Sequence, residues 1–209
     1  MNQKELFICQ TLDRLFPNPT PTLDFRDRYT LLIAVLLSAH STDRMVNRVT
    51  PALFERASDP QTMITLSVDE ILAIVRPCGL GPKKAQAIWD LSHQLLDHFG
   101  GEVPDNLEDL ETLAGVGHKT ASVVLCQGFG LPAFPVDTHI QRCAQRWGLS
   151  RKKSPSAIEG DLKKIFPKRM WARLHLQIIY YARTHCPAKK HFLAGCPICQ
   201  EFVGGFLDN

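Results

Sequence analysis

The sequence predicts an all-α protein, and three observations support this. Apolar residues recur at helical spacing along most of the 209-residue chain, and no stretch shows the sustained alternation typical of a β-strand. Ser, Thr and Asp precede several of these apolar runs, where their side chains would cap a helix N-terminus. A hydrophobic content of 44% with 22% charged residues is ordinary for a soluble chain that buries a core.

Four helices are expected before the first glycine-rich segment. The first carries one apolar stripe and ends before Pro17. The second contains Leu31–Leu37, which is apolar on all sides and therefore predicts a central, buried helix too short to span a bilayer. Ser41-Thr-Asp43 caps a third, which Pro51 is expected to bend or interrupt. Ser67-Val-Asp-Glu70 is a capping box for the fourth.

Two glycine hairpins of one pattern follow, about 36 positions apart. Cys78-Gly-Leu-Gly-Pro-Lys-Lys-Ala85 matches Ala114-Gly-Val-Gly-His-Lys-Thr-Ala121, and each stretch lies between two expected helices. Glycines at this spacing let the backbone turn tightly and expose N–H groups at the start of a helix, where an anion such as phosphate binds. A single hairpin of this kind is more often a plain helix connection. Two in one helical chain predict helix–hairpin–helix units that grip a polyanionic backbone at separate points.

Lys119 and Asp137 are the candidate catalytic residues. Lys119 stands in the first turn of a helix expected from His118 to about Gln127, where the positive end of the helix dipole disfavours its charged form. A neutral lysine is a nucleophile that can form a Schiff base with a sugar aldehyde carbon. Asp137 is expected to cap a helix over residues 138–147, and a carboxylate there can stabilise positive charge on the sugar and shuttle protons. The alternative for Asp137 is a plain cap worth about 1 kcal/mol, and both roles are compatible.

The last third of the chain is expected to contain two more helices and then a loop. The helices run from Ser154-Pro155 through Phe166 and from Met170 to Thr184, and the chain from Cys186 is too rich in Pro, Gly and Cys for a helix of any length. Residues 1–110 carry 10 Lys and Arg against 15 Asp and Glu, whereas residues 111–209 carry 14 against 6. This basic half, beginning at the second hairpin, suits a polyanionic partner; a merely solvated surface is the alternative.

The seven cysteines are an odd number in a chain with a polar N-terminus and no signal peptide, which argues against a disulfide framework. Four are scattered through helical patterns and are interpreted as small core residues: Cys9, Cys78, Cys126 and Cys143. Cys186, Cys196 and Cys199 are clustered, which makes them candidate metal ligands.

The pattern Leu113-x-Gly-Val-Gly-x-Lys-Thr-Ala121, followed by Val136-Asp-Thr-His139, resembles the endonuclease III family of DNA glycosylase/AP lyases. The resemblance covers nearly the whole chain, and its other motifs are Leu31–Ala39, Gly79-Leu80, Gly101-Glu-Val-Pro104 and the terminal cysteines. It implies a bifunctional DNA N-glycosylase of base excision repair that removes oxidised pyrimidines and then cleaves the strand by β-elimination. Lys119 would be the Schiff-base nucleophile and Asp137 the essential carboxylate.

The resemblance also implies a fold of two helical domains with a DNA-binding cleft between them. Residues 22–132 would form a helical barrel with the helix–hairpin–helix motif, and residues 1–21 with 133–209 a second domain carrying the cysteine loop. The damaged base would be flipped into the groove between the domains. The residues implied in DNA binding are Gly115, Val116, Gly117, His118, Thr120, His40, Leu80, Gly81, Lys189 and Lys190.

Three of these positions depart from the family pattern. His40 stands where the family usually has Gln, the residue that fills the gap left by the flipped base. Gly81 replaces a larger side chain beside Leu80 of the strand-separating wedge, and His118 replaces a basic residue before the lysine. None of the three removes the chemistry, but the first two bear on which lesions are preferred.

The cysteines depart most from the family, whose C-x6-C-x2-C-x5-C motif binds a 4Fe-4S cluster. Here nine residues separate Cys186 from Cys196, two separate Cys196 from Cys199, and Gly205 stands at the fourth position. His185 and His191 are candidate replacements for the fourth ligand. We predict a labile 4Fe-4S cluster with an open or histidine-bound corner. A zinc site of three Cys and one His, and a vestigial loop without metal, are the alternatives.

Two other functions remain open from the sequence. One is a monofunctional adenine or thymine-mismatch glycosylase, against which Lys119 argues because such relatives usually lack the lysine. The other is a non-catalytic, structure-specific DNA-binding module. The expected partner is double-stranded DNA with damaged bases or abasic sites, and we expect a cytoplasmic monomer, associated with the nucleoid through its function.

Overall fold

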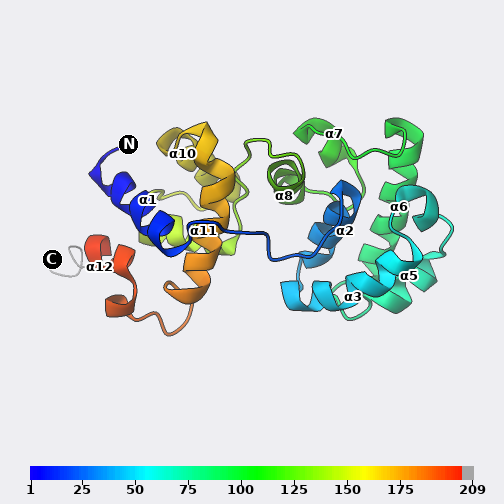
Figure 1. Ribbon diagram of the computed structural model, residues 1–209, viewed down its shortest axis with the longest axis horizontal. Coiled ribbons are helices and arrows are strands. Elements are labelled where there is room, and N and C mark those ends of the chain that lie inside the picture. Colours follow the sequence, from blue (N-terminus) through cyan, green and yellow to red (C-terminus); the bar gives the residue numbers. More distant parts are fainter. Residues whose placement is uncertain (204–209) are drawn as a thin grey trace. The chain divides into compact units, whose positions relative to one another are not determined.

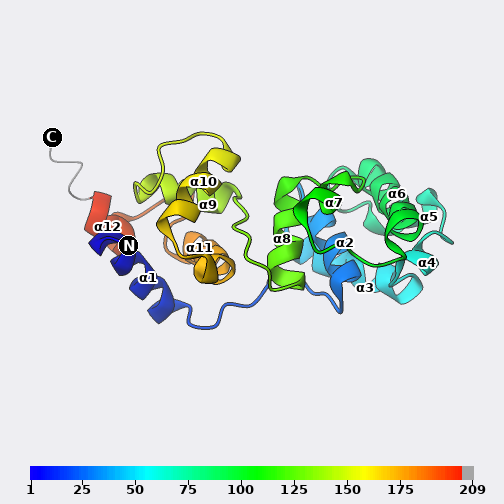
Figure 2. The ribbon, with the colours of Figure 1, turned by 90° about the horizontal axis from the view of Figure 1, so that it is seen from above.

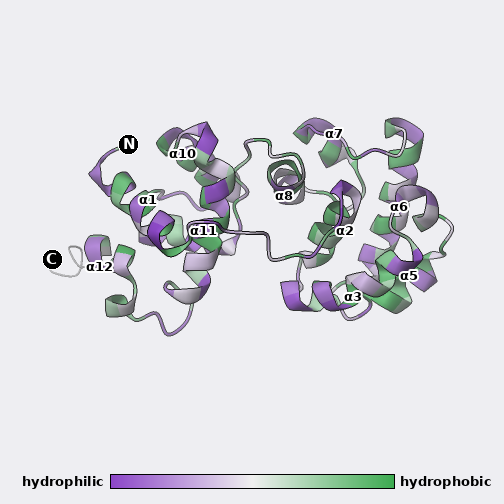
Figure 3. Cartoon of the chain, viewed as in Figure 1, coloured by the Kyte–Doolittle hydropathy of each residue, from purple (hydrophilic) through white to green (hydrophobic). Residues whose placement is uncertain are grey.

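The computed structural model describes residues 1–203 and is all-helical over them, which confirms the predicted fold class (Figure 1). The chain divides into two compact units. Unit 1 joins Met1–Thr20 to the segment from Pro132 onward, and unit 2 is Pro21–Leu131. Figure 3 shows hydrophilic and hydrophobic residues on the same helices in both units, the pattern of amphipathic helices packed around a core. Within residues 1–203, none of the helices has the length and apolar content needed to cross a membrane.

Unit 2 is organised around α2 (Arg28–Ser38), whose side chains from Tyr29 to Leu37 are all buried. This confirms the predicted central helix. α2 packs against α3, α6 and α8, as can be followed in Figure 2. The other helices of the unit are α3 (Asp43–Arg56), α4 (Pro60–Met63), α5 (Val68–Val75), α6 (Gly81–Phe99), α7 (Leu107–Thr112) and α8 (His118–Gly128). Pro51 lies inside α3, which continues to Arg56, so the expected interruption does not occur.

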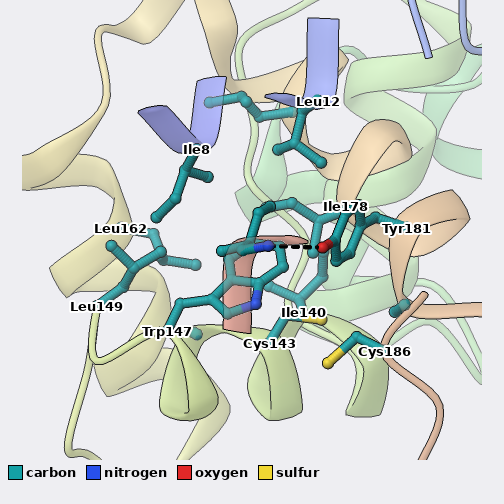
Figure 4. Packing of buried hydrophobic residues seen from close by; sticks show 14 of the residues in the cluster. Ile8, Leu12, Ile140, Cys143, Trp147, Leu149, Leu162, Ile178, Tyr181 and Cys186 are labelled. Carbon is teal, nitrogen blue, oxygen red and sulfur yellow. Dashed lines mark hydrogen bonds between the residues drawn. The ribbon is translucent and has the colours of Figure 1, made fainter. Parts of the chain in front are cut away.

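Unit 1 brings the first helix together with the end of the chain. Its helices are α1 (Gln3–Leu15), α9 (Thr138–Arg146), α10 (Pro155–Ile165), the 3₁₀ turn η1 (Lys168–Met170), α11 (Trp171–Thr184), the 3₁₀ turn η2 (Leu193–Gly195) and α12 (Pro197–Val203). α1 contacts both α11 and α12. Ile8 and Leu12 of α1 are fully buried in one core with Trp147 and Tyr181, whose rings meet edge to face at 5.4 Å (Figure 4). This core continues into the buried cysteines of the terminal loop.

The segment from Cys186 contains one feature that the sequence did not predict. A short helix, α12, begins at Pro197, where the first helical position needs no backbone N–H. Cys199 lies within it and is fully buried. Gly205, the expected fourth position of the family's cysteine motif, lies outside the described residues.

Candidate functional site

The second hairpin, between α7 and α8, has two glycines in different roles. Gly115 has a φ of 74°, and a Cβ there would lie 2.8 Å from the Cβ of Ala87, so both the backbone and the packing require glycine. Val116 is 5% exposed and anchors the hairpin to the core. Gly117 has a φ of −97°, and a Cβ there would meet no atom within 4 Å. The space beside Gly117 is therefore open to an approaching molecule.

The helices that follow the two hairpins begin without a side-chain cap. Neither Leu80, before α6, nor Gly117, before α8, accepts a hydrogen bond with its side chain. The other helices from α1 to α10 all begin with a side-chain acceptor. The first N–H groups of a helix have no partner within the helix. In α6 and α8 no N-cap side chain accepts from these groups, which is the arrangement found at anion-binding helix ends.

Lys119 lies exposed in the first turn of α8, two residues after Gly117. On one side is His118, whose Nδ1 lies 2.7 Å from Oε1 of Glu111, an ion pair when the imidazole is protonated. On the other side is Thr120, which is half-buried. The local fold therefore holds the backbone of Lys119 at a rigid helix start while its amine projects to the surface.

The first hairpin shares the sequence pattern of the second but not its backbone conformation. Its left-handed residue is Leu80, with a φ of 64° and a side chain that is 52% exposed. A Cβ on Gly79 would lie 2.6 Å from the carbonyl oxygen of His40, which itself has a φ of 53° and is exposed. A Cβ on Gly81 would lie 3.2 Å from Cδ1 of Leu72, so the larger side chain of the family pattern would be crowded here. Leu80 and His40 are thus presented on two loops in contact.

Lys84 of α6 connects the helix after the first hairpin to the end of α2, just before His40. Its side chain is 5% exposed, and Nζ donates to the carbonyl oxygen of Leu37 at 2.8 Å and to that of Ala39. Such carbonyls at the end of α2 lack a partner within the helix. Burial lowers the pKa of Lys84. A lysine on the apolar side of the α6 pattern was the available signal, because it needs a polar partner when buried.

Asp137 is the N-cap of α9, as predicted. Its Oδ1 accepts hydrogen bonds from the backbone N–H groups of His139 and Ile140, both at 2.8 Å, and the residue is half-buried. The cap fixes the direction of the carboxylate. Asp137 belongs to unit 1 and Lys119 to unit 2, so each is positioned by its own unit.

The basic residues follow the units rather than the two halves of the sequence. Unit 1 carries 15 Lys and Arg against 7 Asp and Glu, whereas unit 2 carries 9 against 14. The second hairpin therefore belongs to the acidic unit, although the sequence from residue 111 onward is basic as a whole. Lys189 and Lys190 are exposed in the terminal loop of the basic unit, with Lys190 in the left-handed region at a φ of 54°.

The terminal loop gathers Cys186, His191, Cys196 and Cys199. One potential ligand atom of each lies within 4.8 Å of the others, and the three cysteines are fully buried. Hydrogen bonds from Cys143, Cys196 and Cys199, with a further one from Arg146, hold the pKa of Cys186 well below its usual range. The thiolate form, which binds metals, is therefore favoured at Cys186. This group can hold a metal ion.

His185, the other candidate ligand, is not part of this group. Its Nδ1 lies 3.4 Å from the carbonyl oxygen of Gly195. Cys143, interpreted from the sequence as a core residue, is fully buried in α9 and also contacts Cys186. The sequence left both histidines open as the fourth ligand, and the structure places only His191 in the group of potential ligands.

Comparisons with known proteins agree over the whole chain. A family model described as HhH-GPD superfamily base excision DNA repair protein matches residues 33–168. Endonuclease III of Treponema pallidum (strain Nichols) is 43% identical over 194 residues, which cover 93% of this chain and 89% of that protein. A solved non-covalent endonuclease III–DNA complex has a TM-score of 0.91 at 37% identity and covers 100% of both chains. A trapped endonuclease III–DNA covalent intermediate has a TM-score of 0.90 at 37% identity, over 99% of this chain and 100% of that one.

Proposed function

This chain belongs to the HhH-GPD superfamily of base excision DNA repair proteins and is a DNA glycosylase/AP lyase enzyme; we propose that it removes oxidised pyrimidines through a Schiff base on Lys119 and then cleaves the strand. The observation that carries the proposal is the exposed Lys119 in the first turn of α8, two residues after the hairpin glycine Gly117, beside which the space is open. A relative 37% identical to this chain has been trapped in a covalent complex with DNA, which supports covalent chemistry in this family.

The proposed reaction begins with the neutral amine of Lys119. It attacks C1′ of the damaged nucleotide, the bond from C1′ to the base breaks, and the amine proton leaves with the base. The C1′–O4′ bond then opens to a positively charged Schiff base, and O4′ takes up a proton. Loss of the C2′ proton lets the C3′–O bond break, so that the 3′ phosphate departs. Asp137 would stabilise the positive charge on the sugar and act as the proton carrier in these steps.

Three sets of residues are proposed to hold the DNA for this reaction. The N–H groups at the start of α8, which no side chain of the N-cap residue Gly117 caps, would bind a backbone phosphate beside Gly115 and Val116, with His118 and Thr120 flanking the nucleophile. The exposed Leu80 would separate the strands beside Gly81, and His40 would occupy the space of the flipped base. Lys189 and Lys190 would add phosphate contacts from unit 1.

Borohydride trapping on wild-type protein tests the proposed function. With a duplex containing an abasic site, reduction should capture a covalent protein–DNA adduct, since only a Schiff base is reduced to a stable amine. Duplexes with an oxidised pyrimidine should give the same adduct, whereas undamaged DNA should give none. A protein that releases bases without an adduct would be a monofunctional glycosylase. Binding without base release or adduct would indicate a non-catalytic DNA-binding module.

Gly117→Val is expected to weaken DNA binding at least about tenfold while leaving the fold intact. A Cβ at Gly117 would meet no protein atom within 4 Å, and the extended backbone there suits a β-branched residue, so the expected clash is with the DNA backbone. The loss should be the same for every sequence, because phosphate contacts carry no sequence information. Fluorescence anisotropy over a range of salt concentrations measures it, and log affinity should fall linearly with log salt.

Gly115→Ala is the matched control in the same hairpin. The added methyl would clash with the Cβ of Ala87, and the backbone at Gly115 is left-handed. The midpoint of thermal unfolding of Gly115→Ala should therefore fall, whereas that of Gly117→Val should not. Undiminished DNA affinity in Gly117→Val would contradict the assignment of this hairpin to the DNA backbone.

The cofactor implied by the resemblance is a 4Fe-4S cluster in the terminal loop. The described residues offer three thiolates and one imidazole in place of the family's four thiolates. Fe–S clusters are held by thiolates, with histidine as a ligand in some centres, so the donor types alone admit a cluster. The distances between the ligand atoms distinguish more clearly between a cluster and a single metal ion.

A further inference from the structure

The ligand atoms of the terminal loop are too close together to surround an iron–sulfur cube. One from each residue of the group lies within 4.8 Å of the others, and the Sγ atoms of Cys186 and Cys199 are 3.8 Å apart. In a 4Fe-4S cluster each ligand binds a different iron, so the cube lies between the thiolates and holds their sulfurs roughly 6 Å apart. Around one tetrahedral zinc ion, bonds of about 2.3 Å place two sulfurs about 3.8 Å apart. The observed spacing is that of a single ion.

His191 is the fourth member of the group. Its Nε2 is buried and has no hydrogen-bond partner among the described residues, an unusual state for a buried polar atom. Four residues separate Cys186 from His191, four separate His191 from Cys196, and two separate Cys196 from Cys199. The longer segment between the first two cysteines therefore contains the fourth ligand. With His191 as a ligand, no fourth cysteine is needed at the family's fourth position, where this chain has Gly205.

The surroundings hold the cysteines in place. Nη1 of Arg146 donates to Sγ of Cys186 at 3.3 Å and to the carbonyl oxygen of Pro187 at 2.8 Å. The hydroxyl of Tyr181 lies 3.4 Å from Sγ of Cys196 and accepts the backbone N–H of Ile198 at 3.0 Å, which Figure 4 shows as a dashed line. Outer partners of this kind orient metal ligands, and a guanidinium offsets the excess negative charge of three thiolates around a divalent ion.

We propose that Cys186, His191, Cys196 and Cys199 bind a single zinc ion, in place of the iron–sulfur cluster that the family resemblance implies. Four protein ligands close the coordination sphere, so the ion has a structural role. It joins the end of α11 to η2 and α12 and closes the loop that carries Lys189 and Lys190. Zinc has no redox chemistry, so the loop is insensitive to air, in contrast to a cluster with an open corner.

Metal analysis of the wild-type chain tests the proposal. The protein is expressed in medium containing both iron and zinc, in a host that assembles iron–sulfur clusters, and is purified under argon without added metal. We expect about one zinc per chain, no acid-labile sulfide and no brown colour. X-ray absorption at the zinc edge should show three sulfur ligands at about 2.3 Å and one nitrogen at about 2.0 Å. About four iron and four sulfide per chain would overturn the proposal. So would a metal-free chain or one with a Cys186–Cys199 disulfide.

His191→Ala and His185→Ala form a matched pair within the same loop. After dialysis against a chelator, His191→Ala should retain less than about a tenth of the wild-type zinc, whereas His185→Ala should retain it, because Nδ1 of His185 faces Gly195 instead. His191→Cys should restore zinc binding with four thiolates, which shows that the loss comes from the missing ligand rather than from misfolding. Equal zinc retention in both alanine variants would contradict the assignment of His191. These measurements use no DNA, so their outcome leaves the proposed glycosylase function untouched.

Discussion

Replacing Lys119 by glutamine is expected to abolish the borohydride-trapped adduct and to reduce strand cleavage at abasic sites by more than about 10³-fold, because a catalytic nucleophile is lost. Glutamine keeps the length and polarity of the side chain but has no amine that can form a Schiff base. Lys119 is exposed in the first turn of α8 and makes no contribution to the core, so the fold should be unchanged. Affinity for abasic duplex, measured separately, should stay within a few-fold of wild type, since one phosphate contact at most is lost.

Lys83→Gln is the matched control for this substitution. Lys83 holds the equivalent position of the first hairpin, follows Gly81 by two residues and is also exposed. Lys83→Gln removes the same charge from the same unit as Lys119→Gln. If Lys83→Gln still forms the full amount of trapped adduct, the loss in Lys119→Gln comes from the missing nucleophile and not from the missing positive charge. Full β-elimination by Lys119→Gln would show that another amine is the nucleophile.

Asp137→Asn should lower the rate of base release at least about 10²-fold with little change in stability. Asparagine caps a helix as well as aspartate does, so the hydrogen bonds from His139 and Ile140 to the side-chain oxygen can be kept. The substitution removes the charge, and with it the proposed stabilisation of the positive sugar and the proposed proton carrier. Single-turnover base release and thermal unfolding, measured on the same preparation, distinguish these two roles.

Asp27→Asn provides the corresponding control at another cap. Asp27 accepts the N–H of Thr30 at the start of α2, and the proposed chemistry does not involve it. Its activity should match wild type. Asp137→Ala should lose activity like Asp137→Asn and, in addition, about 1 kcal/mol of stability, because alanine cannot cap α9. If Asp137→Asn released bases at the wild-type rate, Asp137 would be a structural cap only.

The helix starts could be predicted because the interactions that define them are local. Ser67 and Glu70 form a reciprocal capping box, and Ser154 and Asp137 cap their helices at the expected positions. Each of these contacts joins residues within three positions of one another, so a short stretch of sequence contains both partners. Pro51 shows the limit of such local reasoning. α3 continues through it because the buried Val49 and Leu53 on either side pack in unit 2, which outweighs one missing hydrogen bond.

The parts of the site that were missed depend on residues far apart in the sequence. Lys84 is buried because it meets the end of α2, 47 positions earlier, and Gly79 is required by the carbonyl of His40. The local sequence can mark Lys84 as a buried cation and Gly79 as a hairpin glycine, but it does not identify the distant carbonyl that each of them meets. The choice between His185 and His191 likewise depends on how the chain turns after α11, which brings one imidazole to the cysteines and directs the other to a backbone carbonyl.

The buried ammonium of Lys84 has a consequence for anyone who wishes to retarget the enzyme. The loop of His40 cannot be exchanged alone. The His40 carbonyl fills the space where Gly79 would carry a side chain, and the neighbouring carbonyls of Leu37 and Ala39 accept hydrogen bonds from Lys84. A transplanted His40 loop of another length would leave that cation buried without an acceptor. The His40 loop, the first hairpin and Lys84 therefore depend on one another, and a chimera with a related enzyme should exchange all three together.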